Sequence, residues 1–325
     1  MVIGATRSGK SRSIVLPTIG IEGLAGENMV VSDPKGELHQ YTYPFLEALG
    51  YNVFVLDFKN PDRSDHFNFL QEVIDAINDD NIPLAQKKAL DITEALVGND
   101  TSSEKIWSEG EKSIMAACIL AVVYDNRKHP EYQNLTNVYH FINNMCEMSD
   151  NPPLKRYIDT IEALNPNHPA LALISATKVA PSKTQGSFNI SALATLRLFA
   201  DINVYNLTKS NSFKIEDLND QKTAIFIILP DYNTTYYGVA SLFVDQIYTK
   251  LADVADLQGG RLKRRVNFIL DEFGNFAVIP DFATKLTVAG GRGIRFNLFL
   301  QSTAQLESDS KKVKYGNCLL YTSDA

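Results

Sequence analysis

The strongest constraint on the fold is a short stretch at the start of the chain, Gly4-Ala5-Thr6-Arg7-Ser8-Gly9-Lys10-Ser11. Two glycines separated by four residues and followed by Lys and Ser form the pattern of a phosphate-binding loop. Such a loop joins a buried strand to a helix, and here Val2 and Ile3 precede it while Ser11 to Ile19 is expected to begin a helix. The glycines let successive backbone N–H groups point at an anion, and the helix N-terminus adds further donors. A chance match in a turn rich in Gly and Ser is the alternative.

The loop pattern predicts a site for ATP and Mg²⁺. We expect the Lys10 ammonium to reach the β- and γ-phosphate oxygens and the Ser11 hydroxyl to ligate Mg²⁺. The residues expected to bind the nucleotide are Gly4, Ala5, Thr6, Arg7, Ser8, Gly9, Lys10, Ser11 and Arg12.

Near-continuous apolar runs separated by helical segments predict an α/β fold with a mostly parallel sheet buried on both faces. After Val2 and Ile3, the predicted strands are Asn28 to Asp33, Asn52 to Asp57, Thr223 to Leu229, Val266 to Leu270 and Phe296 to Leu300. Helices are expected over Leu38 to Leu49 and Tyr237 to Ala255.

The middle of the chain has a different character. No convincing strand occurs between Phe69 and Asn203, and helical periodicity dominates. Helices are expected over Leu84 to Val97, Trp107 to Tyr124, Leu135 to Met148, Lys155 to Leu164 and Ile190 to Leu198. We therefore expect residues 69–203 to form an all-helical domain inserted into an α/β domain built from residues 1–68 and 204–317. Trp107 is interpreted as a core residue of this insertion rather than a platform for stacking bases.

A pair of carboxylates, Asp271 and Glu272, follows the predicted strand Val266 to Leu270. On a strand beside the phosphate loop, Asp271 would hold Mg²⁺ and Glu272 would polarise the attacking water. The long separation from Ser11 along the chain closes if the helical segment is an insertion. An exposed acidic strand end is the alternative.

Two further polar positions are candidates for catalysis. Gln301 follows the last predicted strand, where an amide can sense the γ-phosphate or orient water; an ordinary loop amide is the alternative. Gly290 to Arg295 predicts a flexible basic turn between strands. Arg292, or as second choice Arg295, would contact the γ-phosphate in a neighbouring subunit. An Arg that caps a helix C-terminus is nearly as good an interpretation.

Composition limits the classes of partner. The net charge of −7 excludes a global basic field, so nucleic acid must be contacted by a local patch or a channel formed on assembly. Arg261 to Arg265 is either such a patch or a solvated approach to a strand. The three cysteines are far apart, which predicts reduced thiols and no zinc site. No stretch approaches the roughly 18 to 20 apolar residues of a membrane helix.

Seven segments together carry a resemblance to a known family: Gly4 to Ser13, Val31 to Leu38, Phe67-Asn68, Gln185-Gly186-Ser187, Phe226 to Asp231, Leu270 to Asn275, and Gly291 to Ser302. The chain resembles the conjugative coupling proteins, the TraG-like ATPases of type IV secretion systems, and looks similar to Gram-positive members. The resemblance implies a RecA-like P-loop NTPase fold with an inserted all-α domain. It also implies that Lys10 and Ser11 bind phosphate and Mg²⁺, that Asp271 binds Mg²⁺, that Glu272 and Gln301 are catalytic, and that Arg292 acts in trans.

The family resemblance further implies partners and a location. The expected partners are a relaxase–single-stranded DNA complex and components of the secretion channel, and the full-length protein is expected to be a homo-hexamer at the cytoplasmic face of the cell membrane. Family members carry membrane helices before the loop, whereas this chain has none, and residues 318–325 do not look native. We therefore expect a fragment that is cytoplasmic by itself. A DNA pump of the HerA–FtsK type and a nucleotide-gated docking adaptor are the alternative functions.

Overall fold

The computed structural model describes residues 1–5, 8–98, 105–146, 152–178, 180–230 and 236–306. The chain divides into two compact units, one formed by Met1–Asp65 with Ser212–Ala325 and the other by His66–Asn211. Each unit has its own core and is described by itself.

The first unit is built on a six-stranded sheet in which all strands are parallel, with the order β1-β6-β5-β2-β4-β3. The strands are β1 (Val2–Ile3), β2 (Asn28–Asp33), β3 (Asn52–Asp57), β4 (Thr223–Ile228), β5 (Val266–Leu270) and β6 (Ile294–Leu300). The predicted parallel α/β architecture is thus confirmed. Only β6 differs by more than one residue, because it begins at Ile294 instead of Phe296.

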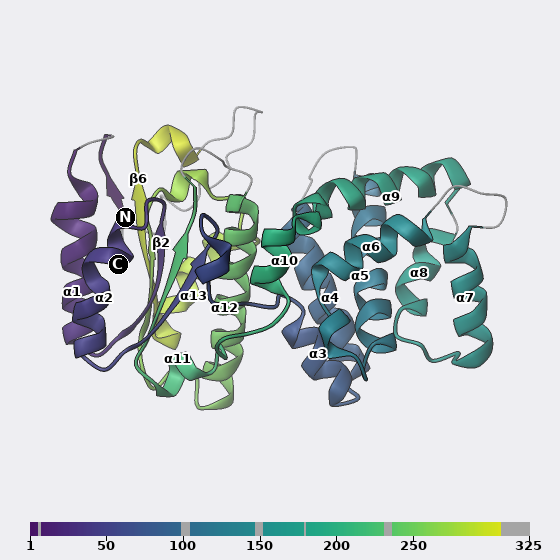
Figure 1. The fold of residues 1–325 in the computed structure, drawn as a ribbon, viewed down its shortest axis with the longest axis horizontal. Helices are drawn as coiled ribbons and strands as arrows, with labels where there is room; N and C mark the ends of the chain where they lie inside the picture. Colours follow the sequence, from purple (N-terminus) through teal and green to yellow (C-terminus); the bar gives the residue numbers. More distant parts are fainter. Residues whose placement is uncertain (6–7, 99–104, 147–151, 179, 231–235, 307–325) are drawn as a thin grey trace. The chain divides into compact units, whose positions relative to one another are not determined.

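Helices cover both faces of the sheet (Figure 1). On one face lie α1 (Leu16–Leu24), which follows a π-helical turn η1 (Ser11–Val15), and α2 (Glu37–Ala48). On the other lie α12 (Tyr237–Leu257) and α13 (Phe282–Arg292), while the short α11 (Asp217–Asp220) precedes β4. Burial on both faces explains why the central strands β2, β4 and β5 are mostly apolar without alternation.

Two side-chain clusters hold these layers together. Under α1 and α2, the core includes Val15, Ile19, Met29, Val31, Leu38, Leu46, Phe226, Ile269 and Phe299. On the opposite face, the Phe296 ring of β6 contacts Phe268, Tyr248 and Phe282, with centroids 4.8, 5.7 and 5.1 Å away. Burying each such side chain contributes about 1.5 to 3 kcal/mol. The two clusters therefore hold the helices on both faces of the sheet.

The second unit, His66–Asn211, contains helices and no strand among its described residues. Its α-helices are α3 (Gln71–Asn78), α4 (Ile82–Val97), α5 (Lys105–Asp125), α6 (Leu135–Met145), α7 (Pro153–Leu164), α8 (Leu171–Lys178), α9 (Ser182–Leu196) and α10 (Ile202–Thr208). The buried stretch from Ile114 to Val123 places α5 at the centre, packed against α3, α4, α6, α8 and α9 (Figure 1).

This helical unit begins earlier and ends later than the expected limits, Phe69 and Asn203. The reason is local: the Phe67 amide donates to the Leu207 carbonyl at 2.8 Å, and the Asn68 amide donates to Asn211 Oδ1 at 2.7 Å. The two crossing segments therefore pair with each other inside the helical unit, and α10 belongs to it.

The interpretation of Trp107 as a core residue is wrong. Its side chain is 44% exposed and meets Phe188 edge to face, with ring centroids 5.8 Å apart. Trp107 lies in the first turn of α5, before the segment that is buried in the helical unit. The helix is apolar as a whole, but its first turn is not buried.

Among the described residues, no helix is both long and apolar enough to cross a membrane.

Candidate nucleotide-binding site

The loop after β1 has the tight curvature that a phosphate cradle needs. The Gly4 amide donates to the Leu300 carbonyl at 3.0 Å, and the Ser8 amide closes a turn onto the Ala5 carbonyl at 3.1 Å. A Cβ on Gly4 would lie 2.8 Å from Ser8 Oγ, and Gly9 has a φ of +85°, a left-handed conformation that favours glycine. Both glycines of the pattern are therefore required by geometry.

Lys10 lies at the ends of the neighbouring strands β1 and β6. Its Nζ donates to the Gly4 carbonyl at 2.5 Å and to the Leu300 carbonyl at 2.8 Å. These bonds hold the ammonium at the carboxyl ends of β1 and β6. An ammonium at this position offers a positive charge to phosphate oxygens.

The Ser11 hydroxyl donates to Asp271 Oδ2 at 3.0 Å, which joins the loop to the end of β5. Asp271 is only 6% exposed, and burial raises the pKa of its carboxyl, while the Ser11 hydrogen bond and the charge of Lys10 oppose that rise. Ser32 of β2 fixes the Asp271 backbone by donating to its carbonyl at 2.7 Å. A hydroxyl beside a carboxylate is a pair of oxygen ligands that fits Mg²⁺.

Glu272 and Gln301 meet at the same edge of the sheet. The Gln301 Nε2 donates to Glu272 Oε2 at 2.8 Å. Glu272 has a φ of +53°, an unusual backbone conformation for a residue with a side chain. The structure therefore brings together Lys10, Ser11, Asp271, Glu272 and Gln301, and their roles in binding and catalysis stay predictions.

One part of that prediction needs correction, because the strand that carries Asp271 is not adjacent to the strand of the loop. β6 lies between β1 and β5. As a consequence, Gln301 follows the strand that separates the strand of the phosphate loop from the strand that precedes the two carboxylates. This order makes Gln301 a neighbour of both halves of the site.

Arg292 lies away from the five residues that meet at the carboxyl ends of the strands. The prediction of a flexible turn over Gly290 to Arg295 is wrong. Gly290 and Gly291 belong to the last turn of α13, Arg292 ends that helix, and Gly293 follows in a left-handed conformation with a φ of +82°. Arg292 therefore precedes β6, whereas Gln301 follows it, and a seven-residue strand spans about 20 Å. The Arg292 guanidinium donates twice to Asp256, at 3.0 and 3.1 Å.

Arg295, the second choice, lies within β6 and is exposed. In the same subunit, neither arginine is at the carboxyl edge of the sheet.

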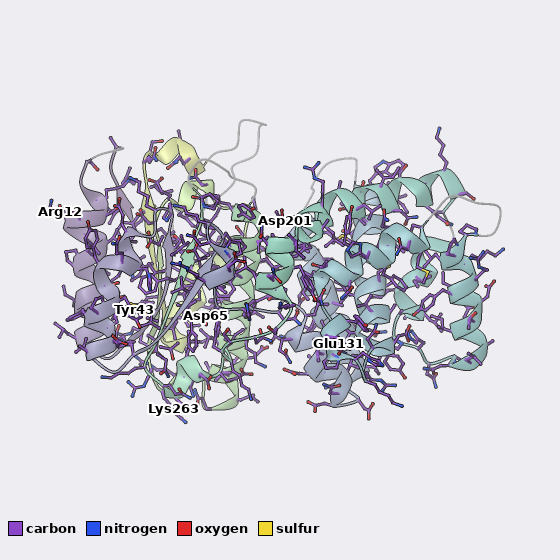
Figure 2. All side chains as sticks on the ribbon, in the orientation of Figure 1. Arg12, Tyr43, Asp65, Glu131, Asp201 and Lys263 are labelled. Carbon is purple, nitrogen blue, oxygen red and sulfur yellow. The ribbon has the colours of Figure 1, made fainter. Side chains whose placement is uncertain are left out.

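The basic run before β5 is engaged in contacts within the protein. Lys263 pairs with Asp220 at 2.6 Å, and Arg264 donates to the Gly26 carbonyl at 3.1 Å. Arg265 pairs with Glu27 at 2.6 Å. Lys263 marks this amino edge of the sheet in Figure 2, and the contacts favour the interpretation of the run as a structural approach to the strand.

Three other predicted positions need comment. Arg12 is exposed, with its side chain at the surface of the unit (Figure 2). Thr6 and Arg7 lie outside the described residues, as does the tail 318–325.

The structure adds two residues that had been assigned no role. Asp33 ends β2, is 1% exposed, and accepts hydrogen bonds at 2.8 Å from the amides of Gly36 and His39. Burial raises the pKa of the Asp33 carboxyl. The turn that Asp33 closes presents Lys35, whose charge acts on Asp271. The signal in the sequence is an Asp at a strand end, followed three residues later by a turn glycine.

A comparison with protein families matches residues 1–321 to the family described as Type IV secretory system Conjugative DNA transfer. Protein VirD4 of Agrobacterium fabrum is 24% identical over 323 residues, covering 94% of this chain and 43% of that protein. Conjugal transfer protein TraG of Escherichia coli is 24% identical over 333 residues, covering 98% and 50%. The chain thus spans about half the length of these relatives.

Among solved structures, the plasmid coupling protein TrwB in complex with ADP and Mg²⁺ matches with a TM-score of 0.68 and 16% identity, covering 98% of this chain and 66% of that one. TrwB in complex with the ATP analogue ADPNP matches with a TM-score of 0.67 and 17% identity, covering 98% and 67%. This likeness confirms the predicted RecA-like α/β P-loop NTPase fold. With a family match over nearly its whole length, the chain belongs to the conjugative DNA-transfer family of type IV secretion systems, the coupling proteins.

Proposed function

We propose that this chain is the ATP-hydrolysing part of a coupling protein that recruits a relaxase–single-stranded DNA complex to a type IV secretion channel. The observation that carries the proposal is the convergence of the phosphate loop, Ser11, Asp271, Glu272 and Gln301 at the ends of three strands. The TrwB structures with ADPNP and with ADP and Mg²⁺ support binding of the same ligands here.

Each side chain has a defined part in the proposed reaction. Lys10 and the loop amides bind the phosphates. Ser11 and Asp271 would hold Mg²⁺, which would neutralise phosphate charge. Glu272 accepts the proton of the water that attacks the γ-phosphorus, the bond to the β-phosphate oxygen breaks, and ADP and phosphate leave. The Gln301 amide, already bonded to Glu272, orients that water or contacts the γ-phosphate.

Turnover by the full chain tests this assignment. Lys10→Ala should abolish ATP hydrolysis by weakening nucleotide binding, whereas Glu272→Gln should abolish hydrolysis and keep binding. Glu47→Gln, at an exposed position on α2, is the matched control and should behave as wild type. Retained turnover in Glu272→Gln would remove Glu272 as the base. Binding without turnover in the wild-type chain would favour a nucleotide-gated adaptor over a motor.

The assembly proposal is a homo-hexamer in which Arg292 acts on the γ-phosphate of the neighbouring subunit. Because Arg292 is paired with Asp256 in its own subunit, a trans role has to be separated from that contact. Mixing Arg292→Ala with Lys10→Ala subunits should partly rescue hydrolysis if Arg292 acts in trans. Asp256→Asn removes the same pair but keeps the arginine, and should retain hydrolysis. Absence of rescue under conditions where hexamers form would count against Arg292.

For the partners, we propose that the helical unit contacts the relaxase and that the full-length protein acts at the cytoplasmic face of the membrane, beside the secretion channel. Lysines on the two units make this testable by cross-linking a cognate relaxase to the chain. Cross-links should fall on lysines of the helical unit such as Lys87, Lys128 and Lys155. Cross-links confined to Lys59 and Lys263 of the α/β unit would assign recognition to that unit instead.

A further inference from the structure

A second glutamine lies beside the proposed catalytic pair. Gln305 belongs to the 3-10 turn η7 (Thr303–Leu306) that follows β6. Its Oε1 accepts a hydrogen bond from the Gln301 backbone amide at 2.8 Å. This bond fixes the backbone from which the Gln301 side chain extends toward Glu272.

Gln305 also touches the loop that follows Glu272. An ideal Cβ on Gly274, in the turn η6 (Phe273–Asn275), would lie 2.5 Å from Gln305 Cδ and 2.7 Å from its Oε1. Contacts that short do not occur, so only glycine allows the Gln305 side chain to lie against this backbone. Gln305 is thereby held from two sides, by the end of β6 and by the loop after β5.

The contacts form a closed ring. Glu272 is joined through the backbone to Gly274, which packs on the Gln305 side chain. Gln305 accepts a hydrogen bond from the Gln301 backbone amide. The Gln301 side-chain amide in turn donates to the Glu272 carboxylate at 2.8 Å. A residue with a φ of +53°, such as Glu272, costs free energy and persists only where its surroundings hold it. The ring provides such surroundings for the carboxylate.

We propose that Gln305 is a positioning residue for ATP hydrolysis. Through its side-chain oxygen and its contact with Gly274, Gln305 holds the side-chain amide of Gln301 and the Glu272 carboxylate in position relative to each other. This role rests on the proposed function of Glu272 and Gln301. In this role Gln305 acts only through the pair Gln301 and Glu272. Displacing a catalytic group by a fraction of an ångström lowers kcat while substrate binding by the phosphate loop is retained.

The first test is kinetic and uses Gln305→Met, which keeps the length of the side chain and removes the acceptor. We expect kcat to fall about tenfold with the KM for ATP unchanged, the size of effect that loss of one positioning hydrogen bond produces. In a Gln301→Ala background, Gln305→Met should change kcat less than twofold, because the group it positions is gone. Gln40→Met, at an exposed position on α2, is the control and should match the wild type. Gly274→Ala, which displaces Gln305 without removing its oxygen, should reproduce the loss in kcat.

A second readout needs no turnover. Hydrogen exchange of the Gln301 amide, measured by NMR on the full chain, should be at least tenfold faster in Gln305→Met than in wild type. Gln305→Glu, which keeps an acceptor oxygen, should retain slow exchange. The Gly4 amide, bonded to the Leu300 carbonyl, serves as the reference and should not change.

Two results would overturn the proposal. One is an equal hydrogen-exchange rate of the Gln301 backbone amide in wild type and in Gln305→Met. The other is that Gln305→Met lowers kcat by the same factor in the wild-type and Gln301→Ala backgrounds. Failure of the wild-type chain to hydrolyse ATP would instead remove the proposed function. The two failures are therefore distinguishable.

Discussion

Glu22, in the last turn of α1, makes the stability of the α/β unit dependent on pH. Its Oε1 accepts a hydrogen bond from Asn297 of β6 at 3.2 Å, and its Oε2 is buried with no hydrogen-bond partner. Burial, followed by the nearby charge of Glu27, raises the pKa of the Glu22 carboxyl from 4.5 to about 7, against the opposing effects of Asn297, Arg295 and Arg265. The helix that carries Glu22 continues from η1, the π-helical turn that follows the phosphate loop.

The sign of the effect follows from proton linkage. In the unfolded chain Glu22 releases its proton near pH 4.5, whereas the folded chain holds it until about pH 7. The free energy of unfolding therefore falls as the pH rises through this window and levels off above it. A pKa change from 4.5 to about 7 corresponds to about 3 kcal/mol at roughly 1.4 kcal/mol per pH unit. Because Glu22 is only partly buried, we expect about 2 kcal/mol.

The variant Glu22→Gln isolates this term, since an amide of the same shape does not titrate. The free energy of unfolding of the variant minus that of wild type should increase by about 2 kcal/mol from pH 5 to pH 8. Hydrogen exchange of β2 and β5 peptides reports the α/β unit at each pH, after correction for intrinsic rates. Fluorescence of Trp107, the one tryptophan, follows the helical unit during urea unfolding and should not distinguish the variant from wild type. An equal difference between variant and wild type at pH 5 and pH 8 would refute the reasoning.

Two further substitutions test the packing and the metal site. Gly110→Ala should destabilise the helical unit by about 1 to 3 kcal/mol, because the new methyl would lie 2.4 Å from the Phe188 ring. Urea unfolding followed by Trp107 fluorescence measures this loss of stability. An unchanged midpoint of unfolding would contradict the prediction. Gly20→Ala on α1, with nothing within 4 Å of the added methyl, is the control and should be neutral or stabilising. Ser11→Ala should lower ATP affinity about tenfold with Mg²⁺ present and leave it unchanged in EDTA, by calorimetry; equal losses in both conditions would exclude Ser11 as a metal ligand.

The central strands β2, β4 and β5 could be predicted because all their residues are buried, which makes their sequences mostly apolar. Polar residues end β2 and follow β5. In a parallel sheet such ends share one edge, which is why Asp271 and Gln301 were expected in the site. The order of the strands was not predictable in the same way. The position of β6 between β1 and β5 depends on how the connecting helices cross the sheet, and no local pattern records it.

The misjudged parts of the site have a common physical cause. Gly290 and Gly291 favour a turn by propensity, yet packing of Phe282 and Ala289 into the core carries the helix through them to Arg292. Gln305 gave no signal, because one amide side chain in an irregular turn has no periodicity. Tertiary contacts decide both cases.

Titration of the chain with ADPNP and Mg²⁺ by calorimetry tests the central claim most directly, because it measures binding at the phosphate loop without requiring assembly or turnover. The account predicts one site per chain, weaker binding when Mg²⁺ is removed, and loss of binding in Lys10→Ala. No binding by the wild-type chain, or equal binding by Lys10→Ala, would contradict it.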